Sequence, residues 1–504
     1  MVYSQAVHRR VNSNGCYELD KMTGEIPVFL SSFLFYQRGS KQKRKDYCKL
    51  SKTIGREEEK MSQQKLTKGN ILTSLVAFAV PVLLALFLQA MYGAADLIIV
   101  GRFAGTNEQS GVASGSQLFN MITMLITGLT MGVTVFVGNA IGAGRKEQAG
   151  RGIGSGIAIF AVVAILVTAA VVPFSNALTG FLHAPQEAFA QTSNYVRICG
   201  MGTIFIVAYN VIGAVFRGIG DSKTPLATVA IACAINIIGD LVLVAGLGMG
   251  ATGAAIATVS AQAVSVVISL WVISKRALPF VFSLSYIRFD AACVKKILLV
   301  GVPIALQELL VQFSFLFIQV IVNGMGVMES AAVGVAEKVC VFLMLVASAY
   351  MQSISAFVAQ NNGAGMHQRS KKALQYGIAT AFAAGLIMGT LALVGGSWLA
   401  SIFSKEAQVI AAAHEYLKAY AIDCLLTAIL FCFIGYFNGC GKTVFVMIQG
   451  VVGAFCVRIP AVYFMSRLDD AGLFQIGLAT PLSSAVQILL CLAAFQIYEK
   501  RYRQ

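Results

Sequence analysis

Charged residues are scarce in this chain, and the side chains that most enzymes use for catalysis are scarcer still. Charged side chains make up 12% of the 504 residues, far below the roughly 25% of soluble domains. The four histidines are scattered one to a segment, and the eleven cysteines include no Cys-x-x-Cys pair. The composition therefore argues against a water-soluble globule, a histidine-based active site and a clustered metal site. Five cysteines in apolar runs are interpreted as small hydrophobic residues rather than disulfides or ligands: Cys233, Cys340, Cys424, Cys432 and Cys456.

Long apolar runs dominate the sequence instead. Hydrophobic residues make up 57% of the chain, and a helix needs about 20 mostly apolar residues to cross a bilayer. The sequence predicts an all-α membrane protein with about 12 transmembrane helices. Six runs fall in each half, near 71–100, 110–139, 151–174, 190–216, 226–248 and 252–274, then 294–323, 328–360, 374–403, 408–437, 443–465 and 472–498.

Short motifs recur at a fixed offset between the halves. The segment 136–144 (FVGNAIGAG) returns 221 residues later as 357–365 (FVAQNNGAG), and 216–220 (FRGIG) returns at the same offset as 437–441 (FNGCG). Since each half contains an even number of helices, both halves enter the membrane from the same side. The repeat predicts two six-helix bundles related by pseudo-twofold symmetry, an arrangement typical of secondary transporters.

The net charge of +15 follows from membrane topology and does not indicate a nucleic-acid partner. Basic residues concentrate in alternate loops, which is the positive-inside pattern and predicts that both termini are cytoplasmic. These residues are Arg145, Lys146, Arg151, Arg217, Lys223, Lys275, Arg276, Arg288, Lys295, Lys296, Arg369, Lys371, Lys372, Lys442, Lys500, Arg501 and Arg503.

The runs and loops together give the expected domain organisation. Residues 1–70 are expected to form a cytoplasmic N-terminal tail, part of which is a start-site extension if translation begins at Met61. An N-lobe (71–275) and a C-lobe (294–498) follow, joined by a cytoplasmic linker (276–293), and 499–504 form a short cytoplasmic tail.

One apolar run carries a polar stripe. Gln89, Tyr92 and Asp96 are spaced i, i+3 and i+7, so they share one helix face. An ionisable group in mid-membrane costs roughly 2.5–3.5 kcal/mol on insertion scales, and a single polar stripe must therefore face the bundle interior. The alternative interpretation is that Asp96 merely caps the helix before Gly101 and Arg102.

Two further runs add oxygen ligands. Asn236 and Asp240 lie one turn apart in the run 226–248, and Thr258 lies in the next run. A lone Asn often bonds a neighbouring helix, and a Thr hydroxyl often bonds its own backbone. Together with Asp96, however, the three supply the hard oxygen ligands that suit a small cation or proton exchange.

The segments that carry these residues closely resemble the multidrug and toxic compound extrusion (MATE) family of bacterial multidrug efflux proteins. The matching segments are 95–102 (ADLIIVGR), 216–225 (FRGIGDSKTP), 236–240 (NIIGD) and 250–258 (GATGAAIAT), and the resemblance extends from about residue 65 to the C-terminus.

The resemblance implies a pair of bundles that export organic cations and other amphipathic compounds in exchange for Na⁺ or H⁺. It also implies site residues, some in an N-lobe cation site and some in the lining of its cavity. The cation site comprises Asp96, Asn236, Asp240 and Thr258, which form a metal site if the coupling ion is Na⁺, and the cavity residues are Gln89 and Tyr92.

The second half departs from the family pattern. Some branches carry acids at the places of Val311 and Thr427, whereas here acids occur at Glu308 and Asp423, roughly one turn earlier. Arg458 stands in the middle of the run 443–465. A C-lobe polar site of Glu308, Asp423 and Arg458 therefore stays an open hypothesis, in which Arg458 is a counter-ion for one of the acids. Its alternatives are a structural hydrogen bond and a side chain that snorkels to the interface.

These observations predict a secondary active antiporter of the bacterial inner membrane, a monomer in the lipid bilayer with no cofactor and no catalytic residues. Its cargo would be small-molecule drugs or organic cations. Met121, Met124 and Met131 are interpreted as packing residues, and the alternative is that their flexible side chains line the cargo cavity. The alternative is a lipid-linked oligosaccharide flippase of the same superfamily, which needs several cationic groups in its cavity, and only Arg458 is a good candidate. A membrane enzyme would need a nucleophile, a base and a metal or His constellation, and none is spaced to suggest one.

Overall fold

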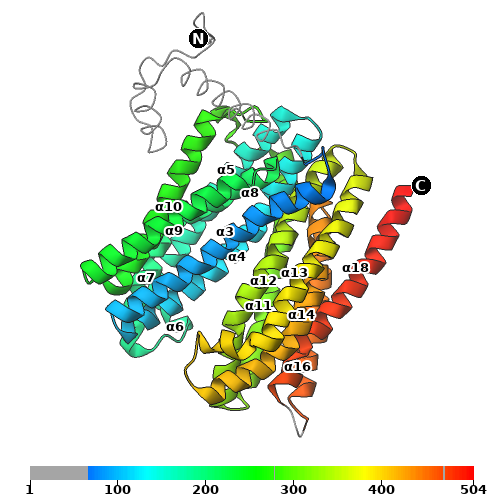
Figure 1. Cartoon of the computed structure of the whole chain (residues 1–504). Helices are drawn as coiled ribbons and strands as arrows, with labels where there is room; N and C mark the ends of the chain where they lie inside the picture. The colour runs from blue at the N-terminus through cyan, green and yellow to red at the C-terminus, as the bar shows by residue number, and fades with distance from the viewer. Residues whose placement is uncertain (1–65, 277, 469–471, 504) are drawn as a thin grey trace, which may run out of the picture. The chain divides into compact units, whose positions relative to one another are not determined.

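A computed structural model describes residues 66–276, 278–468 and 472–503, without the side chains of 501–503. Every regular element in this part of the chain is helical (Figure 1). The expected tail up to residue 65, including the Met61 start, lies outside the described residues. The side chains of Arg501 and Arg503 lie outside them as well.

The N-lobe is built from helices that alternate in direction across the bundle. Its elements are α3 (Ile71–Phe103), α4 (Thr106–Gly142), α5 (Lys146–Val171), α6 (Ser175–Phe181), η1 (Gln186–Ala188), α7 (Phe189–Met201), α8 (Thr203–Ile219), α9 (Lys223–Asp240), η2 (Leu241–Gly246) and α10 (Gly250–Lys275).

The C-lobe repeats this order after a short linker element. Its elements are η3 (Leu284–Tyr286), α11 (Ala291–Asn323), α12 (Val327–Gly363), α13 (His367–Ser401), α14 (Ala407–Gly439), α15 (Thr443–Val451), η4 (Val452–Arg458), α16 (Ile459–Met465), α17 (Leu473–Gly477) and α18 (Ala479–Arg503).

The count of membrane-spanning helices confirms the prediction of about twelve. Eleven described helices are long and apolar enough to cross a membrane, and there are twelve if one bent pair is a single span. The bent pair joins Gln186–Met201 to Thr203–Ile219 at 53°, so the run expected near 190–216 is not one straight helix. The break falls at Gly202, where a Cβ would overlap the Val259 side chain of α10. Glycine therefore allows the chain to turn in close contact with its neighbour.

Two membrane spans contain π-helical segments that the sequence pattern does not predict, one at the end of its span and one in the middle. The segment η2 directly follows Asp240, and η4 ends at Arg458. Such segments frequently occur at functional sites because they displace the backbone from regular helical spacing. In both lobes, then, irregular backbone adjoins a buried charged side chain.

The two lobes pack against each other through α4, which contacts α11 and α12, and through α3, which also contacts α12. Near the ends of these helices, Nε2 of Gln360 donates to the backbone oxygen of Gly218 over 2.8 Å. We call this end of the molecule the basic end, because the loops 143–146, 220–223, 276–290, 364–367 and 440–443 carry most of the basic loop residues. The lobes are therefore in direct contact at the basic end.

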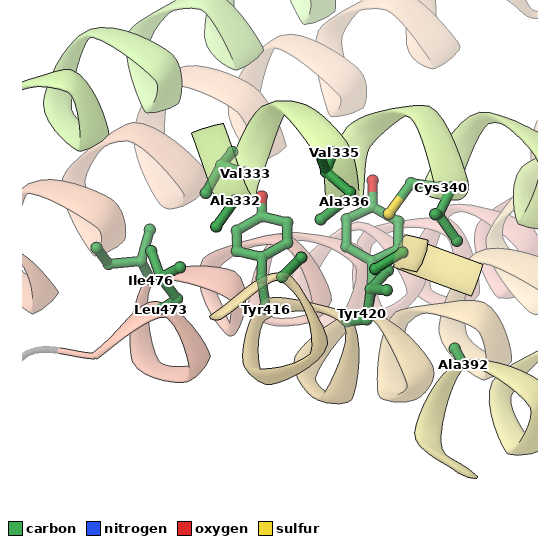
Figure 2. Packing of buried hydrophobic residues seen from close by; sticks show 14 of the residues in the cluster. Ala332, Val333, Val335, Ala336, Cys340, Ala392, Tyr416, Tyr420, Leu473 and Ile476 are labelled. Atoms are coloured by element: carbon green, nitrogen blue, oxygen red, sulfur yellow. The ribbon is translucent and has the colours of Figure 1, made fainter. Parts of the chain in front are cut away.

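Apolar packing fills the interior of the C-lobe away from the basic end. Tyr416 and Tyr420 of α14 extend toward the small residues Ala332 and Ala336 of α12 (Figure 2). The two tyrosine rings stack with their centroids 6.1 Å apart. Since small side chains on one helix accommodate large ones on the next, α12 and α14 pack closely along this stretch.

Candidate cation site in the N-lobe

Three helices bring the N-lobe polar residues together. Asp96 lies in α3, Asn236 and Asp240 in α9, and Thr258 in α10. The Thr258 hydroxyl donates to Oδ2 of Asp96 over 3.2 Å and accepts from Nδ2 of Asn236 over 3.4 Å. The carboxyls of Asp96 and Asp240 are close enough to interact with each other. The four residues singled out by the sequence thus form one cluster.

The cluster lies inside the bundle. Asp96 is 4% exposed, Asn236 is 1% exposed and Asp240 is fully buried. Asp96 does not cap its helix, because α3 continues to Phe103. On α10, the buried residues around Thr258 include Ala254, Ala255 and Ala257, and such small side chains let neighbouring helices approach closely.

Several oxygen atoms in the cluster have no hydrogen-bond donor. Oδ1 of Asp96, Oδ1 of Asn236 and both carboxyl oxygens of Asp240 are buried without a hydrogen-bond partner. Buried polar atoms are normally satisfied, and buried charges need a compensating partner. All four atoms are acceptors, so the groups that can satisfy them are a cation, a proton or the O–H of a water molecule.

A small cavity adjoins the cluster. It has about 10 Å³ of room for the centre of a water molecule, which corresponds to about one water. Its lining residues are Tyr92, Tyr209, Val229, Ala232, Asn236, Thr258, Ala261 and Gln262. Since Asn236 and Thr258 belong to both the cluster and the cavity wall, the cavity extends the polar region beyond the acids.

Two side-chain hydrogen bonds connect the polar stripe of α3 to this cavity. Nε2 of Gln89 donates to the Tyr209 hydroxyl over 2.7 Å, and Nε2 of Gln262 donates to the Tyr92 hydroxyl over 3.4 Å. Sequence reasoning did not single out Tyr209, because it is an isolated tyrosine in an apolar run with no spacing relation to the acids.

The C-lobe residues are arranged differently. Asp423 accepts hydrogen bonds from the hydroxyls of Thr427 over 2.9 Å and Ser484 over 2.6 Å. Nη1 of Arg458 donates to the Ser314 hydroxyl over 2.9 Å, and its guanidinium lies 4.4 Å from the ring centroid of Phe315. Both oxygens of Asp423 are therefore already satisfied by hydroxyl groups.

The three predicted C-lobe residues, Glu308, Asp423 and Arg458, do not contact one another as a single site. The charges of Arg458 and Asp423 attract each other, but the two side chains do not form a salt bridge. Within the described ranges, the half-buried Glu308 makes no hydrogen bond or ion pair and has no charged neighbour. Arg458 is 6% exposed, so it does not snorkel to the surface.

Comparison with known proteins identifies the architecture. A family model described as MatE matches residues 81–242 and again residues 303–464. The chain belongs to the MatE family. The second matched range of this MATE transporter begins and ends 222 residues after the first (303 − 81 and 464 − 242). The family model therefore matches the N-lobe and the C-lobe separately.

Curated relatives and solved structures agree with this assignment. "Probable multidrug resistance protein YoeA" of Bacillus subtilis (strain 168) is 25% identical over 451 residues, covering 88% of this chain and 97% of that protein. "Probable multidrug resistance protein NorM" of Thermotoga maritima is 25% identical over 409 residues, covering 80% of this chain and 86% of that protein.

The solved structures show the same fold. A MATE family transporter of the MOP superfamily in an outward-facing conformation has a TM-score of 0.82 at 20% identity, covering 87% of this chain and 98% of the other. A MOP superfamily transporter from Pyrococcus furiosus Vc1 (DSM3638) has a TM-score of 0.83 at 21% identity, with the same coverage. The chain is therefore a multi-pass membrane transporter with the MATE fold.

The repeat offset also shows how the lobes differ chemically. At 222 residues from Asp96 and Asp240 stand Ile318 and Val462, both buried apolar residues. At the same offset, Asn236 corresponds to Arg458. The two halves share a fold, but the pair of acids is present only in the N-lobe.

Two of the three methionines lie in different surroundings. Met131 is 3% exposed and accepts a hydrogen bond from Ser355 of α12, so it packs between the lobes. Met124 is 43% exposed and accepts a hydrogen bond from Gln312 of α11. Met124 is therefore the better candidate for a residue that contacts cargo.

Proposed function

We propose that this MATE transporter is a secondary active antiporter that exports organic cations or amphipathic drugs in exchange for Na⁺ or H⁺. The observation that carries the proposal is the group of buried acceptor oxygens on Asp96, Asn236 and Asp240 that lack a donor. Two ionised carboxylates this close repel each other, so either a proton or Na⁺ is bound favourably between them. The curated relatives are multidrug resistance proteins, which supports drugs as the cargo class.

The position of α3 links this site to movement of the lobes. Asp96 of α3 belongs to the N-lobe cluster, while the same helix packs against α12 of the C-lobe. Phe87 of α3 and Phe342 of α12 meet edge to face, with ring centroids 6.5 Å apart. Neutralising the acids removes their repulsion, and any repacking of α3 that follows changes its contact with the C-lobe.

Pro81 gives α3 a place to bend during such a change. It lies inside the helix, and a proline leaves one backbone carbonyl without its helical donor. Binding of the cation from outside and binding of cargo from inside would then favour different arrangements of the lobes. This is the alternating access that two repeated bundles allow.

The proposal includes a location and a topology. The relatives come from bacteria, and we place the protein in the bacterial cytoplasmic (inner) membrane as a monomer. The basic end faces the cytoplasm by the positive-inside rule, so both termini are cytoplasmic.

Ethidium export from proteoliposomes tests the proposed function. The purified full chain would be reconstituted and an inward Na⁺ gradient or an inward pH gradient imposed separately. Export driven by one of the two gradients is the expected result, and it identifies the coupling ion. Export that neither gradient accelerates would overturn the antiport proposal.

A further inference from the structure

The polar region of the N-lobe extends past the acids toward the basic end. From Asp96 and Asp240 it passes through Asn236 and Thr258 to the small cavity, whose far wall includes Tyr209 of α8. The helices that carry these residues, α3, α8, α9 and α10, each continue from the cavity to the basic end. A cation that moved from the site to the basic end inside the N-lobe would therefore pass along this side of α8.

Arg217 lies beyond this cavity, two turns after Tyr209 on the same side of α8. Tyr209, Gly213 and Arg217 follow one another at intervals of four residues, which puts them on one stripe of α8. A Cβ on Gly213 would lie 3.3 Å from Nη1 of Arg217. The guanidinium is thus folded back along the helix toward Tyr209, with which it interacts electrostatically.

The position of Arg217 corrects the sequence interpretation, which counted it with the basic loop residues. It belongs to the last turn of α8, and its Nε is buried without a hydrogen-bond partner. None of the salt bridges found between described residues includes Arg217. Its positive charge is consequently not neutralised by a neighbouring carboxylate in this part of the chain.

The C-lobe provides an internal comparison. The FRGIG and FNGCG motifs align at 221 residues, which pairs Tyr209 with Leu430, Gly213 with Ile434 and Arg217 with Asn438. Leu430 and Ile434 are buried apolar residues, and Asn438 is uncharged. The lobe that lacks the acid pair has apolar side chains along this stripe and no charge at its end.

We propose that Arg217 is an electrostatic barrier that prevents the cation bound at Asp96 and Asp240 from passing through the N-lobe into the cytoplasm. A fixed guanidinium repels Na⁺ and protons, and positive groups exclude cations from pores in this way. The cation is then released only when the lobes rearrange, so its movement stays coupled to cargo. This inference depends on the proposed cation antiport.

Cation leak in the absence of cargo tests the barrier. Proteoliposomes containing the full-length wild type, Arg217→Gln or Arg217→Lys would receive an inward gradient of the coupling ion, with no ethidium present. Proton entry is followed by internal pyranine fluorescence, and Na⁺ entry by ²²Na⁺ uptake. We expect Arg217→Gln to leak at least about tenfold faster than wild type, whereas Arg217→Lys stays near the wild-type rate because it keeps the charge.

A second substitution locates the leak. Adding Asp96→Asn to Arg217→Gln should remove the excess leak if the cation passes through the acid site. An excess leak that persists in the double variant would contradict the proposed route. If Arg217→Gln does not reconstitute, Arg217→Met carries the same prediction, because methionine keeps an unbranched aliphatic side chain without the charge.

The controls separate this inference from the proposed function. If wild-type export responds to neither gradient, the antiport proposal fails, and the barrier fails with it. If wild-type export is coupled but the uncharged variants at position 217 leak cations no faster than wild type, only the proposed barrier role of Arg217 is wrong.

Discussion

Gly142 of α4 and Gly363 of α12 pack reciprocally across the lobe interface. A Cβ on Gly142 would overlap the backbone oxygen of Gln360, and a Cβ on Gly363 would overlap the backbone oxygen of Asn139. Gly363 follows Gly142 by 221 residues, and Gln360 follows Asn139 by the same offset. The recurring motif therefore has a physical basis: each copy provides the glycine that the backbone of the other copy requires.

Substitution of these glycines should separate the lobes at the basic end. We predict that Gly142→Ala and Gly363→Ala each destabilise the contact between the lobes at the basic end by about 1–3 kcal/mol, the usual range for overpacking. Thermal unfolding of the purified protein measures the loss. Gly334→Ala in α12 is the matched control, because a Cβ there meets no atom within 4 Å; equal effects at positions 334 and 363 would contradict the packing argument.

The Thr258 hydroxyl should strengthen cation binding. It joins Asp96 to Asn236 through two hydrogen bonds, and valine has nearly the same shape without the hydroxyl. Thr258→Val should raise the concentration of coupling ion needed for half-maximal export by roughly tenfold, equivalent to about 1.4 kcal/mol. Thr258→Ser keeps the hydroxyl and should remain close to wild type. An unchanged ion dependence in the valine variant would remove Thr258 from the site.

Asp423 should act in stability rather than in ion coupling. Its oxygens are satisfied by Thr427 and Ser484, in contrast to the unpartnered oxygens of the N-lobe acids. We expect Asp423→Asn to lower the temperature of thermal unfolding and to leave the ion concentration for half-maximal export within about twofold of wild type. A larger shift in the ion dependence would show that the C-lobe also binds the coupling ion.

Asp290 should stabilise the start of α11 in a pH-dependent way. Its carboxylate accepts hydrogen bonds from the backbone N–H groups of Ala292 over 3.0 Å and Cys293 over 3.2 Å. Chiefly because of the Cys293 bond, the pKa of the Asp290 carboxyl lies below its ordinary value. Asp290→Ala should lower the free energy of unfolding by about 1 kcal/mol at pH 6, whereas Asp290→Asn keeps most of the cap.

The sign of the pH effect follows from the lowered pKa. The stabilisation is complete above the unfolded-state pKa of about 3.9 and disappears as the pH falls through the folded-state pKa. The stability difference between wild type and Asp290→Ala should therefore shrink as the pH is lowered below about 4. A difference that stays constant down to pH 3 would exclude the ionised carboxylate as its source.

The fold and the N-lobe cluster were accessible from the sequence because they depend on periodic patterns. Apolar runs of membrane length predict the helices, and the spacing of Gln89, Tyr92 and Asp96 predicts which face of α3 turns inward. The convergence of α3, α9 and α10 was implied by family resemblance, since spacing within one helix cannot specify which other helices lie beside it.

Other features depend on tertiary packing and could not be predicted. The bend at Gly202 requires the approach of Val259, and the π segments η2 and η4 change the backbone without a local sequence signal. The direction of the Arg217 side chain is set by the space beside Gly213. A basic residue at the end of an apolar run is otherwise most simply assigned to a loop.

Gradient-driven ethidium export by single-acid variants tests the central claim most directly. Asp96→Asn and Asp240→Asn would be reconstituted beside the wild type and Glu187→Gln, an exposed acid outside the site. If the two carboxyls together carry the coupling cation, each site variant binds ethidium but loses at least about tenfold in export rate, while Glu187→Gln exports like the wild type. Wild-type export by purified, ethidium-binding Asp96→Asn or Asp240→Asn would contradict the account.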